Sequence, residues 1–301
     1  MLINKNTVYS IKHQLGNLDW KIVVGNKEFD AVEITSFIFK YIKAFTEKQL
    51  DLPLQKAVIT IPSYFNKVEI FNLKHAAYQA GLEQVKLLPD SLAIAYAYGW
   101  KKNSHQKILV LDFQDNLTAI SILEINGSNI KEIALRGDKY LGGDDWNDRI
   151  INWIKEQLKQ QYNLDLDNSA LNQRIKWAAK NAQMELSSAN EVDISLPFFG
   201  INENNEPINF ETKLTKSKFE KITNSLLARL KKMVYQTLQD ANLQANQIDE
   251  VLLAGEGTTM NQIHYFFKNF IGHEPHGDIN LQEVKAIGAA YYGHKINWNG
   301  K

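Results

Sequence analysis

The chain contains two segments that end in almost the same way, and this repeat limits the folds that it can adopt. In each half, an apolar strand, a helix of about four turns and an alanine-rich helix with a Tyr-Gly ending occur in that order. The two alanine-rich helices read AIAYAYG (93–99) and AIGAAYYG (286–293). Self-similarity of this kind indicates that a structural unit has been duplicated. We therefore expect two related lobes.

Apolar runs and capping signals indicate an α/β fold class. The run AVITI (57–61) is typical of a parallel strand that is covered on both faces. Asn66 and Glu69 have the spacing of a capping box and predict the start of the next helix. Three further strands are predicted as a meander, at 107–112, 117–125 and 129–137. A helix that begins near Asp144 is expected to follow them.

The polar segment KKNSHQ (101–106) is the predicted boundary between the lobes. We expect a first lobe at 1–100 and a second lobe at 107–301, with an inserted subdomain at about 170–215. About thirty residues precede Asp30, and they show one hairpin signature at Gly25-Asn26. Because the second half has a meander before its repeated unit and the first half shows none, we expect the first lobe to be incomplete.

Composition excludes several classes of function. Lys plus Arg and Asp plus Glu both number 34, so the formal charge is zero and nothing favours a nucleic acid or an anionic membrane as partner. The chain has no cysteine, which removes disulfides and thiolate chemistry. It shows no apolar run long enough to span a bilayer, so we expect a cytoplasmic protein. His273, His276 and Asp278 fall close together, but we interpret them as a solvated loop and predict no metal site.

Five stretches, spread in order along the chain, resemble the nucleotide-binding domain of the seventy-kilodalton heat-shock (DnaK-type) chaperone family. They are KAVITIPSYFN (56–66), AAYQAGLEQVKLLPDSLAIAYAYG (76–99), RGDKYLGGDDWNDRIINW (136–153), AAKNAQMELSSANEVDISLP (178–197) and KAIGAAYYG (285–293). The resemblance implies a duplicated two-lobe actin-like ATPase fold, with ATP or ADP and Mg²⁺ as cofactors. It also implies that the family's first phosphate turn and catalytic lysine would precede the region matching 4–16. We expect no peptide-binding domain in this chain.

The resemblance places the family's second phosphate turn directly after the strand 107–112. Asp112 is retained there, as a residue that would hold Mg²⁺ or water in the family or would simply cap a turn. The family's three glycines, its threonine and its second aspartate become Gln114, Asp115, Asn116, Leu117 and Ala119. At about 4 Å, the Asp115 charge would repel a phosphate charge by roughly 1 to 4 kcal/mol. We predict that this turn has a structural role only.

Three other family sites are also altered. Asp90 falls at the glutamate that positions the attacking water in the family, and it also fits a helix cap. Ser187 is the one match in the adenosine-binding helix, where Lys180, Gln183 and Met184 differ from the family pattern. Gly255, Gly257 and Thr258 lie in the turn GEGTT (255–259), which could bind a phosphate or could serve strand-to-helix packing.

Three hypotheses follow from these changes. The first is a pseudo-ATPase, a relative of the chaperone ATPase domain that acts through protein partners. The second is an ATP- or ADP-binding module with weak hydrolysis or nucleotide switching in the second lobe. The third is a fragment of a longer or split chaperone. An incomplete first lobe would expose one edge of its sheet. We expect one of three features to compensate for this: a rearranged N-terminal hairpin, self-association through the exposed edge, or strands supplied by a partner.

Overall fold

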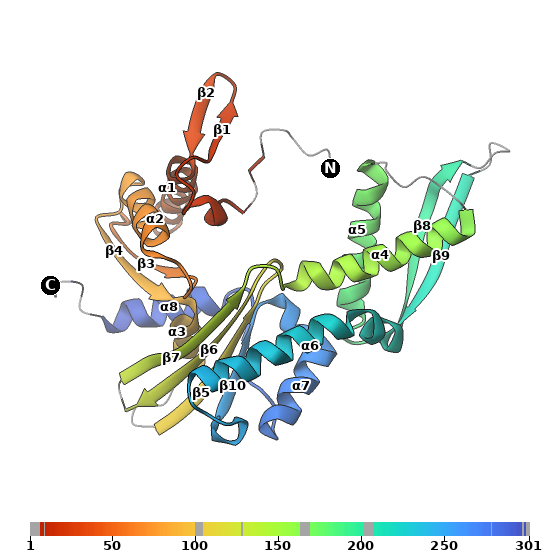
Figure 1. Ribbon diagram of the computed structural model, residues 1–301. Helices are drawn as coiled ribbons and strands as arrows, with labels where there is room; N and C mark the ends of the chain where they lie inside the picture. The colour runs from red at the N-terminus through yellow and green to blue at the C-terminus, as the bar shows by residue number, and fades with distance from the viewer. Residues whose placement is uncertain are drawn as a thin grey trace. The chain divides into compact units, whose positions relative to one another are not determined.

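The computed structural model describes residues 7–8, 10–99, 105–127, 129–162, 169–201, 207–277, 279–296 and 298 (Figure 1). Most of the predicted linker 101–106, together with Asp278, lies outside these residues. Contacts divide the chain into unit 1, Met1–Ala97 with Lys285–Lys301, and unit 2, Tyr98–Val284. The sequence analysis assigned the last helix to the second lobe, whereas almost all of that helix belongs to unit 1.

Unit 1 contains a hairpin, a two-stranded parallel sheet and four α-helices among its described residues. Its elements are η1 (Ile11–Gln14), β1 (Lys21–Val24), β2 (Lys27–Asp30), α1 (Ala31–Leu50), β3 (Lys56–Ile61), α2 (Lys67–Gln79), β4 (Gln84–Pro89), α3 (Asp90–Ala97) and α8 (Val284–Lys295). The predicted hairpin is present, with Gly25 at φ 64° in its turn. The capping box of Asn66 and Glu69 is also confirmed at the start of α2.

Helices cover both faces of the parallel pair β3–β4. One face packs on α2, where Ala77, Leu82 and Val85 form a buried cluster with Ile59. The other face, which includes Val58, packs with α3 and α8 in a cluster of Leu88, Ala93 and Ala289. Glycine allows α8 to approach α3 closely, because a Cβ on Gly288 would lie 2.5 Å from the carbonyl carbon of Ala93. This tertiary contact explains why α8 belongs to unit 1.

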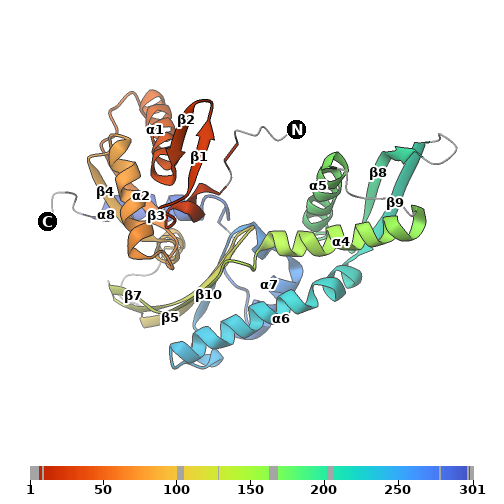
Figure 2. The same ribbon diagram turned by 45° about the horizontal axis from the view of Figure 1, so that its top comes forward.

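Unit 2 is built on a four-stranded sheet in the order β10-β5-β6-β7 (Figures 1 and 2). Its elements are β5 (His105–Phe113), β6 (Thr118–Asn126), β7 (Asn129–Asp138), α4 (Gly143–Tyr162), α5 (Ser169–Glu185), β8 (Glu191–Ile201), β9 (Pro207–Thr215), α6 (Lys216–Asp240), η2 (Ala245–Gln247), β10 (Glu250–Ala254), η3 (Glu256–Thr259) and α7 (Asn261–Ile271). The predicted meander β5–β6–β7 is antiparallel, and β10 pairs with β5 in parallel.

The core of unit 2 is continuous from the sheet to the helices around it. Central strand residues such as Leu109, Leu111 and Ile120 are fully buried, and they share one apolar cluster with Trp146 of α4 and Leu230 of α6. The hairpin β8–β9 lies against α5 at one end of this unit, as both ribbon views show. The carboxyl end of β5 and the start of α4 therefore rest on a rigid scaffold.

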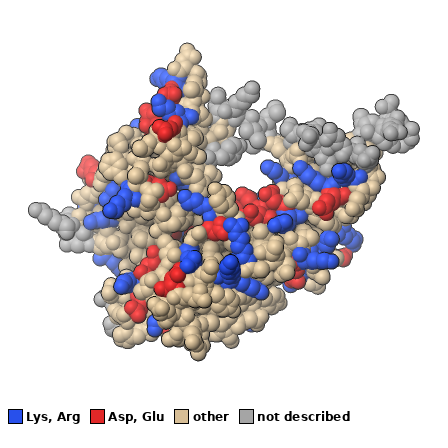
Figure 3. All heavy atoms as spheres, viewed as in Figure 1, with Lys and Arg blue, Asp and Glu red and all other residues tan. Residues whose placement is uncertain are grey.

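On the face drawn in Figure 3, basic and acidic side chains are interspersed among the coloured residues, with no single large basic area. No helix in the described part of the chain is long and apolar enough to cross a membrane.

Candidate functional site

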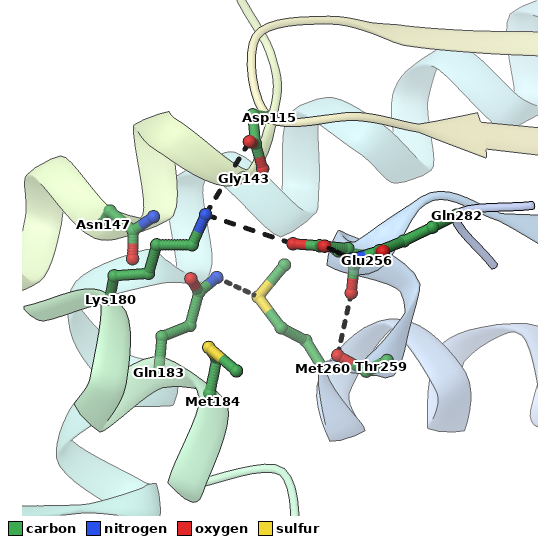
Figure 4. Close-up of a pocket in the computed structure, with 11 residues that line it drawn as sticks. Asp115, Gly143, Asn147, Lys180, Gln183, Met184, Glu256, Thr259, Met260 and Gln282 are labelled. Carbon is green, nitrogen blue, oxygen red and sulfur yellow. Dashed lines mark hydrogen bonds and ion pairs between the residues drawn. The ribbon is translucent and has the colours of Figure 1, made fainter. Parts of the chain in front are cut away.

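A pocket of about 250 Å³ opens in unit 2 where five segments of the chain meet (Figure 4). The turn between β5 and β6, the start of α4, the C-terminal part of α5, the turn after β10 and the segment just before α8 each contribute to its wall. It is lined by Asp115, Gly143, Asn147, Lys180, Gln183, Met184, Glu256, Gly257, Thr259, Met260 and Gln282. The pocket is therefore formed at the second phosphate turn that the resemblance indicated.

The β5–β6 turn is held in place by the first turn of α4. Its own closing hydrogen bond runs from the Gln114 amide to the Leu117 carbonyl at 2.9 Å. The Gly143 amide donates to the Gln114 carbonyl at 2.9 Å, and the Asp144 amide donates to the Asp115 carbonyl at 2.7 Å. The turn thus accepts hydrogen bonds from N–H groups that otherwise have no partner within the helix. In this structure its carbonyl groups serve to cap a helix.

Asp112 is the next-to-last residue of β5 and is 4% exposed. It is paired across the sheet with Ala119 of β6 and Ala254 of β10, and its carboxylate accepts a hydrogen bond from the Gln114 side chain at 2.9 Å. Asp112 does not line the pocket, whereas Asp115 does. The acidic side chain that the turn contributes to the pocket is therefore that of Asp115, which stands where the family has a glycine.

The pocket contains one cation between two carboxylates, as Figure 4 shows. The ammonium of Lys180 lies 3.8 Å from the carboxylate of Asp115 and 4.0 Å from that of Glu256. Gln282 also donates a hydrogen bond to Glu256. Because these three charged side chains are 48%, 54% and 47% exposed, each ion pair contributes only about 0.2 to 1 kcal/mol. Their main effect is on charge, because two carboxylates and one ammonium leave the pocket wall net negative.

Asp144 adds a third acidic group beside this cluster. The residue as a whole retains exposed surface, but partial burial of its carboxyl group raises its pKa, and the nearby charge of Asp115 raises the pKa further. Lys180 acts in the opposite direction. The carboxyl group of Asp144 is thus easier to protonate than that of an isolated aspartate.

The predicted glycine turn after β10 packs around an aromatic side chain. A Cβ on Gly257 would overlap the ring of Phe113, and one on Gly255, which has φ +88°, would lie 2.6 Å from the carbonyl carbon of Phe113. Thr258 is buried, and its hydroxyl donates to the Gly255 carbonyl at 2.7 Å. Of these three predicted cofactor-binding residues, the pocket is lined by Gly257 alone. Packing against Phe113 accounts for both glycines.

The last two predicted site residues, Ser187 and Asp90, are not among the residues that line the pocket. The hydroxyl of Ser187 donates to the Met184 carbonyl at 2.6 Å at the end of α5. Asp90 belongs to unit 1, where it begins α3, is 7% exposed and has the Lys285 ammonium 3.3 Å from its carboxylate. The structure does not bring the predicted residues together as one constellation within unit 2.

Several pocket residues were missed as site candidates in the sequence analysis. Asn147 lies one helical turn after Gly143 on α4, a spacing that places both on one side of the helix. The Gln183 amide lies 3.0 Å from the sulfur of Met260. Helical spacing from Gly143 could have indicated Asn147, but no local pattern marks Met260 or Gln282.

No group of three metal-ligating side chains capable of holding an ion occurs among the described residues. His276 lies 3.0 Å from the Glu250 carboxylate, and His273 lies near backbone carbonyls of Asp249 and Glu274. These contacts give both histidines partners within the protein.

Comparison with known proteins places these features in a family. The family model described as "Hsp70 protein" matches residues 3–297. The chain is 39% identical over 97% of its length to the "Chaperone protein DnaK" of Ureaplasma urealyticum serovar 10, covering 49% of that protein. It is 40% identical over 96% of its length to the protein of the same name from Thermotoga neapolitana, again covering 49%.

These matches confirm the predicted resemblance and the actin-like α/β fold class. The family also implies ATP or ADP with Mg²⁺ as ligands. The chain spans about half the length of the relatives that it matches. On the family model and these identities together, the chain belongs to the Hsp70 family and corresponds to its nucleotide-binding domain.

Proposed function

We propose that this chain is a pseudo-ATPase of the Hsp70 family that does not turn over ATP and acts through contacts with other proteins. The observation that carries the proposal is the charge of the pocket at the β5–β6 turn. Asp115 from that turn and Glu256 from the turn after β10 face one cation, Lys180. A triphosphate would bring several negative charges into a site that is already net negative.

Backbone groups that a phosphate would use are already engaged. The Gln114 amide donates within its own turn, and the amides of Gly143 and Asp144 at the start of α4 donate to the carbonyl groups of Gln114 and Asp115. The space beside Gly255 and Gly257 is filled by Phe113. Side chains of Gln114 and Asp115 also replace the glycines that open a phosphate-binding turn. These residues do not fit a magnesium triphosphate.

Magnesium-dependent ATP turnover tests the proposal. We expect the rate with the purified chain to equal the background without protein, and Asp112→Asn to leave it unchanged. Turnover that Asp112→Asn abolishes would refute the pseudo-ATPase assignment, because the variant removes the one acidic strand-end residue retained from the family turn.

A second candidate function is nucleotide binding without efficient hydrolysis, and the pocket lining favours it. Three amide side chains, those of Asn147, Gln183 and Gln282, line the same pocket as Lys180, and such groups can bind a base, a sugar or a single phosphate. In that case Lys180→Met should weaken ADP binding, whereas Lys176→Met, one turn earlier on the same helix and outside the pocket lining, should not. If the chain does not bind nucleotide at all, ADP binding will be undetectable for the unchanged chain and for both variants.

A further inference from the structure

The acidic side chains in the pocket at the β5–β6 turn are not fully paired. The carboxylate of Asp115 accepts no hydrogen bond from the described residues, and the Lys180 ammonium is 3.8 Å away from it. One oxygen of Glu256 accepts a hydrogen bond from Gln282, while the other lies 4.0 Å from the same ammonium. Both separations exceed the length of about 2.7 to 2.9 Å that is typical of a charge-assisted hydrogen bond. The two carboxylates therefore retain the capacity to accept hydrogen bonds from a ligand.

A buried amide in the same pocket also lacks a partner. Asn147 is 7% exposed and lines the pocket, and its side-chain oxygen makes no hydrogen bond with the described residues. Figure 4 shows this amide pointing from α4 towards the Lys180 side chain. Rotation of the amide by 180° exchanges its oxygen and nitrogen, so the oxygen can accept from a donor inside the pocket. Because a buried acceptor without a donor is unfavourable, this side chain favours a ligand that donates hydrogen bonds.

We propose that this pocket binds the guanidinium group of an arginine side chain from a partner protein, with Asp115 and Glu256 as its acceptors. The inference rests on the proposed function, because a pocket occupied by ATP would be closed to a partner. Two carboxylates face one ammonium, and Asp144 is close enough to interact electrostatically with Asp115 and Lys180. A cation is therefore the ligand whose charge complements that of the pocket wall.

The size and the lining of the pocket favour a single side chain. Its volume of about 250 Å³ is below the range of about 300 to 1,000 Å³ that is usual for pockets that hold a drug-sized molecule. A metal ion is disfavoured, because the described residues contain no group of three side chains that could hold one. An extended side chain enters such a space while the rest of the partner remains outside.

The arrangement of the acceptors favours arginine over lysine. Asp115 and Glu256 come from two separate turns, and both lie within 4.0 Å of one ammonium. The planar guanidinium has five N–H donors and can bind two carboxylates at once, whereas an ammonium is a compact point charge. Met184 and Met260 in the lining offer apolar contacts to the arginine methylene groups. The Lys180 side chain is 48% exposed, so it can turn towards solvent when the guanidinium enters.

A titration with blocked amino acids tests the proposal on the full chain without nucleotide. The probe is N-acetyl-arginine amide, and its binding is followed by ligand-observed NMR. We expect saturable binding with a dissociation constant on the order of a millimolar, as befits so small a ligand. N-acetyl-citrulline amide has the same shape without the charge and should bind about fivefold more weakly or less. N-acetyl-lysine amide should also bind more weakly than the arginine probe.

Three pocket variants connect the binding to named side chains. Asp115→Asn and Glu256→Gln should each weaken binding of the arginine probe by about 1.5- to 5-fold, and Lys180→Met should strengthen it by a similar factor because a competing cation is removed. This last sign is opposite to the one expected for ADP. Glu185→Gln and Lys176→Met, which lie on the same helix outside the pocket lining, are the matched controls and should leave the dissociation constant unchanged.

Several results would overturn the proposal. They are the absence of saturable binding, equal binding of the citrulline or lysine probe, and weaker binding by Lys180→Met. Free arginine carries an additional carboxylate and should bind more weakly than the blocked probe, so tighter binding of free arginine would assign the pocket to a small molecule instead. Loss of arginine binding alone leaves the pseudo-ATPase assignment intact, since that assignment fails only if ATP turnover is detected and depends on Asp112. The two proposals can therefore fail separately.

Discussion

Adding a methyl group at Gly142 should destabilise unit 2, because this glycine lies directly against the β5–β6 turn. A Cβ at this position would lie 2.6 Å from the carbonyl carbon of Asp115 and 2.7 Å from the amide nitrogen of Leu117. Both are backbone atoms and cannot rotate away as a side chain can. Gly142→Ala therefore forces the turn away from the first turn of α4.

The size of the effect follows from what the displacement disrupts. Overpacking in a well-packed region costs about 1 to 3 kcal/mol. The two hydrogen bonds from Gly143 and Asp144 to the turn contribute about 0.5 to 1.5 kcal/mol each. A loss of about 2 to 5 kcal/mol is expected, which lowers the unfolding midpoint of a chain of this size by roughly 5 to 15 °C.

Gly143→Ala is the matched control for this variant. The nearest atom to a Cβ at Gly143 is the side-chain oxygen of Asp115 at 3.5 Å, an ordinary contact. Because Gly143 begins α4, alanine should be neutral or slightly stabilising there. Differential scanning calorimetry of both variants and the unchanged chain measures the difference. Equal midpoints for Gly142→Ala and Gly143→Ala would refute the role of the turn as a cap of α4.

Two further predictions concern packing and pH. Gly288→Ala should weaken the approach of α8 to Ala93 in unit 1, seen as a lower midpoint and faster hydrogen exchange in α8, whereas unchanged exchange would contradict this packing. Asp144→Asn should raise stability to urea at pH 7, because the folded-state pKa of Asp144 is raised above its ordinary value of 3.8 and the folded state therefore loses stability as pH rises through that window. The advantage of the variant should shrink as pH falls toward 4, and an advantage that grows there would contradict the direction of the shift.

Local signals predicted much of the fold. The hairpin at Gly25-Asn26, the capping box of Asn66 and Glu69 and the meander 107–137 all depend on residues close in sequence, and the structure contains each of them. The grouping of α8 with unit 1 was not predicted, because it depends on the contact between Gly288 and Ala93. No periodicity within α8 specifies that partner.

The candidate site was predictable only in part, and for a similar reason. The sequence identified Asp115 as a charge in the phosphate turn and Lys180 as a departure from the family pattern, and Glu256 lies in the predicted turn GEGTT (255–259). Their proximity across the pocket requires the positions of three separate elements. For Gly257 the sequence suggested a phosphate-binding role, but in the structure this glycine lies against the ring of Phe113. Its packing partner could not be predicted from the turn alone.

Direct binding of ATP and of ADP, each with Mg²⁺, tests the central claim most directly. Isothermal titration of the purified chain, paired with a thermal-unfolding scan, measures it. The account predicts no saturable heat with ATP at millimolar concentration and no change in the unfolding midpoint. A ligand at a hundred times its dissociation constant stabilises by about 2.7 kcal/mol, so a saturable ATP titration with a midpoint rise of roughly 5 °C or more would contradict the account.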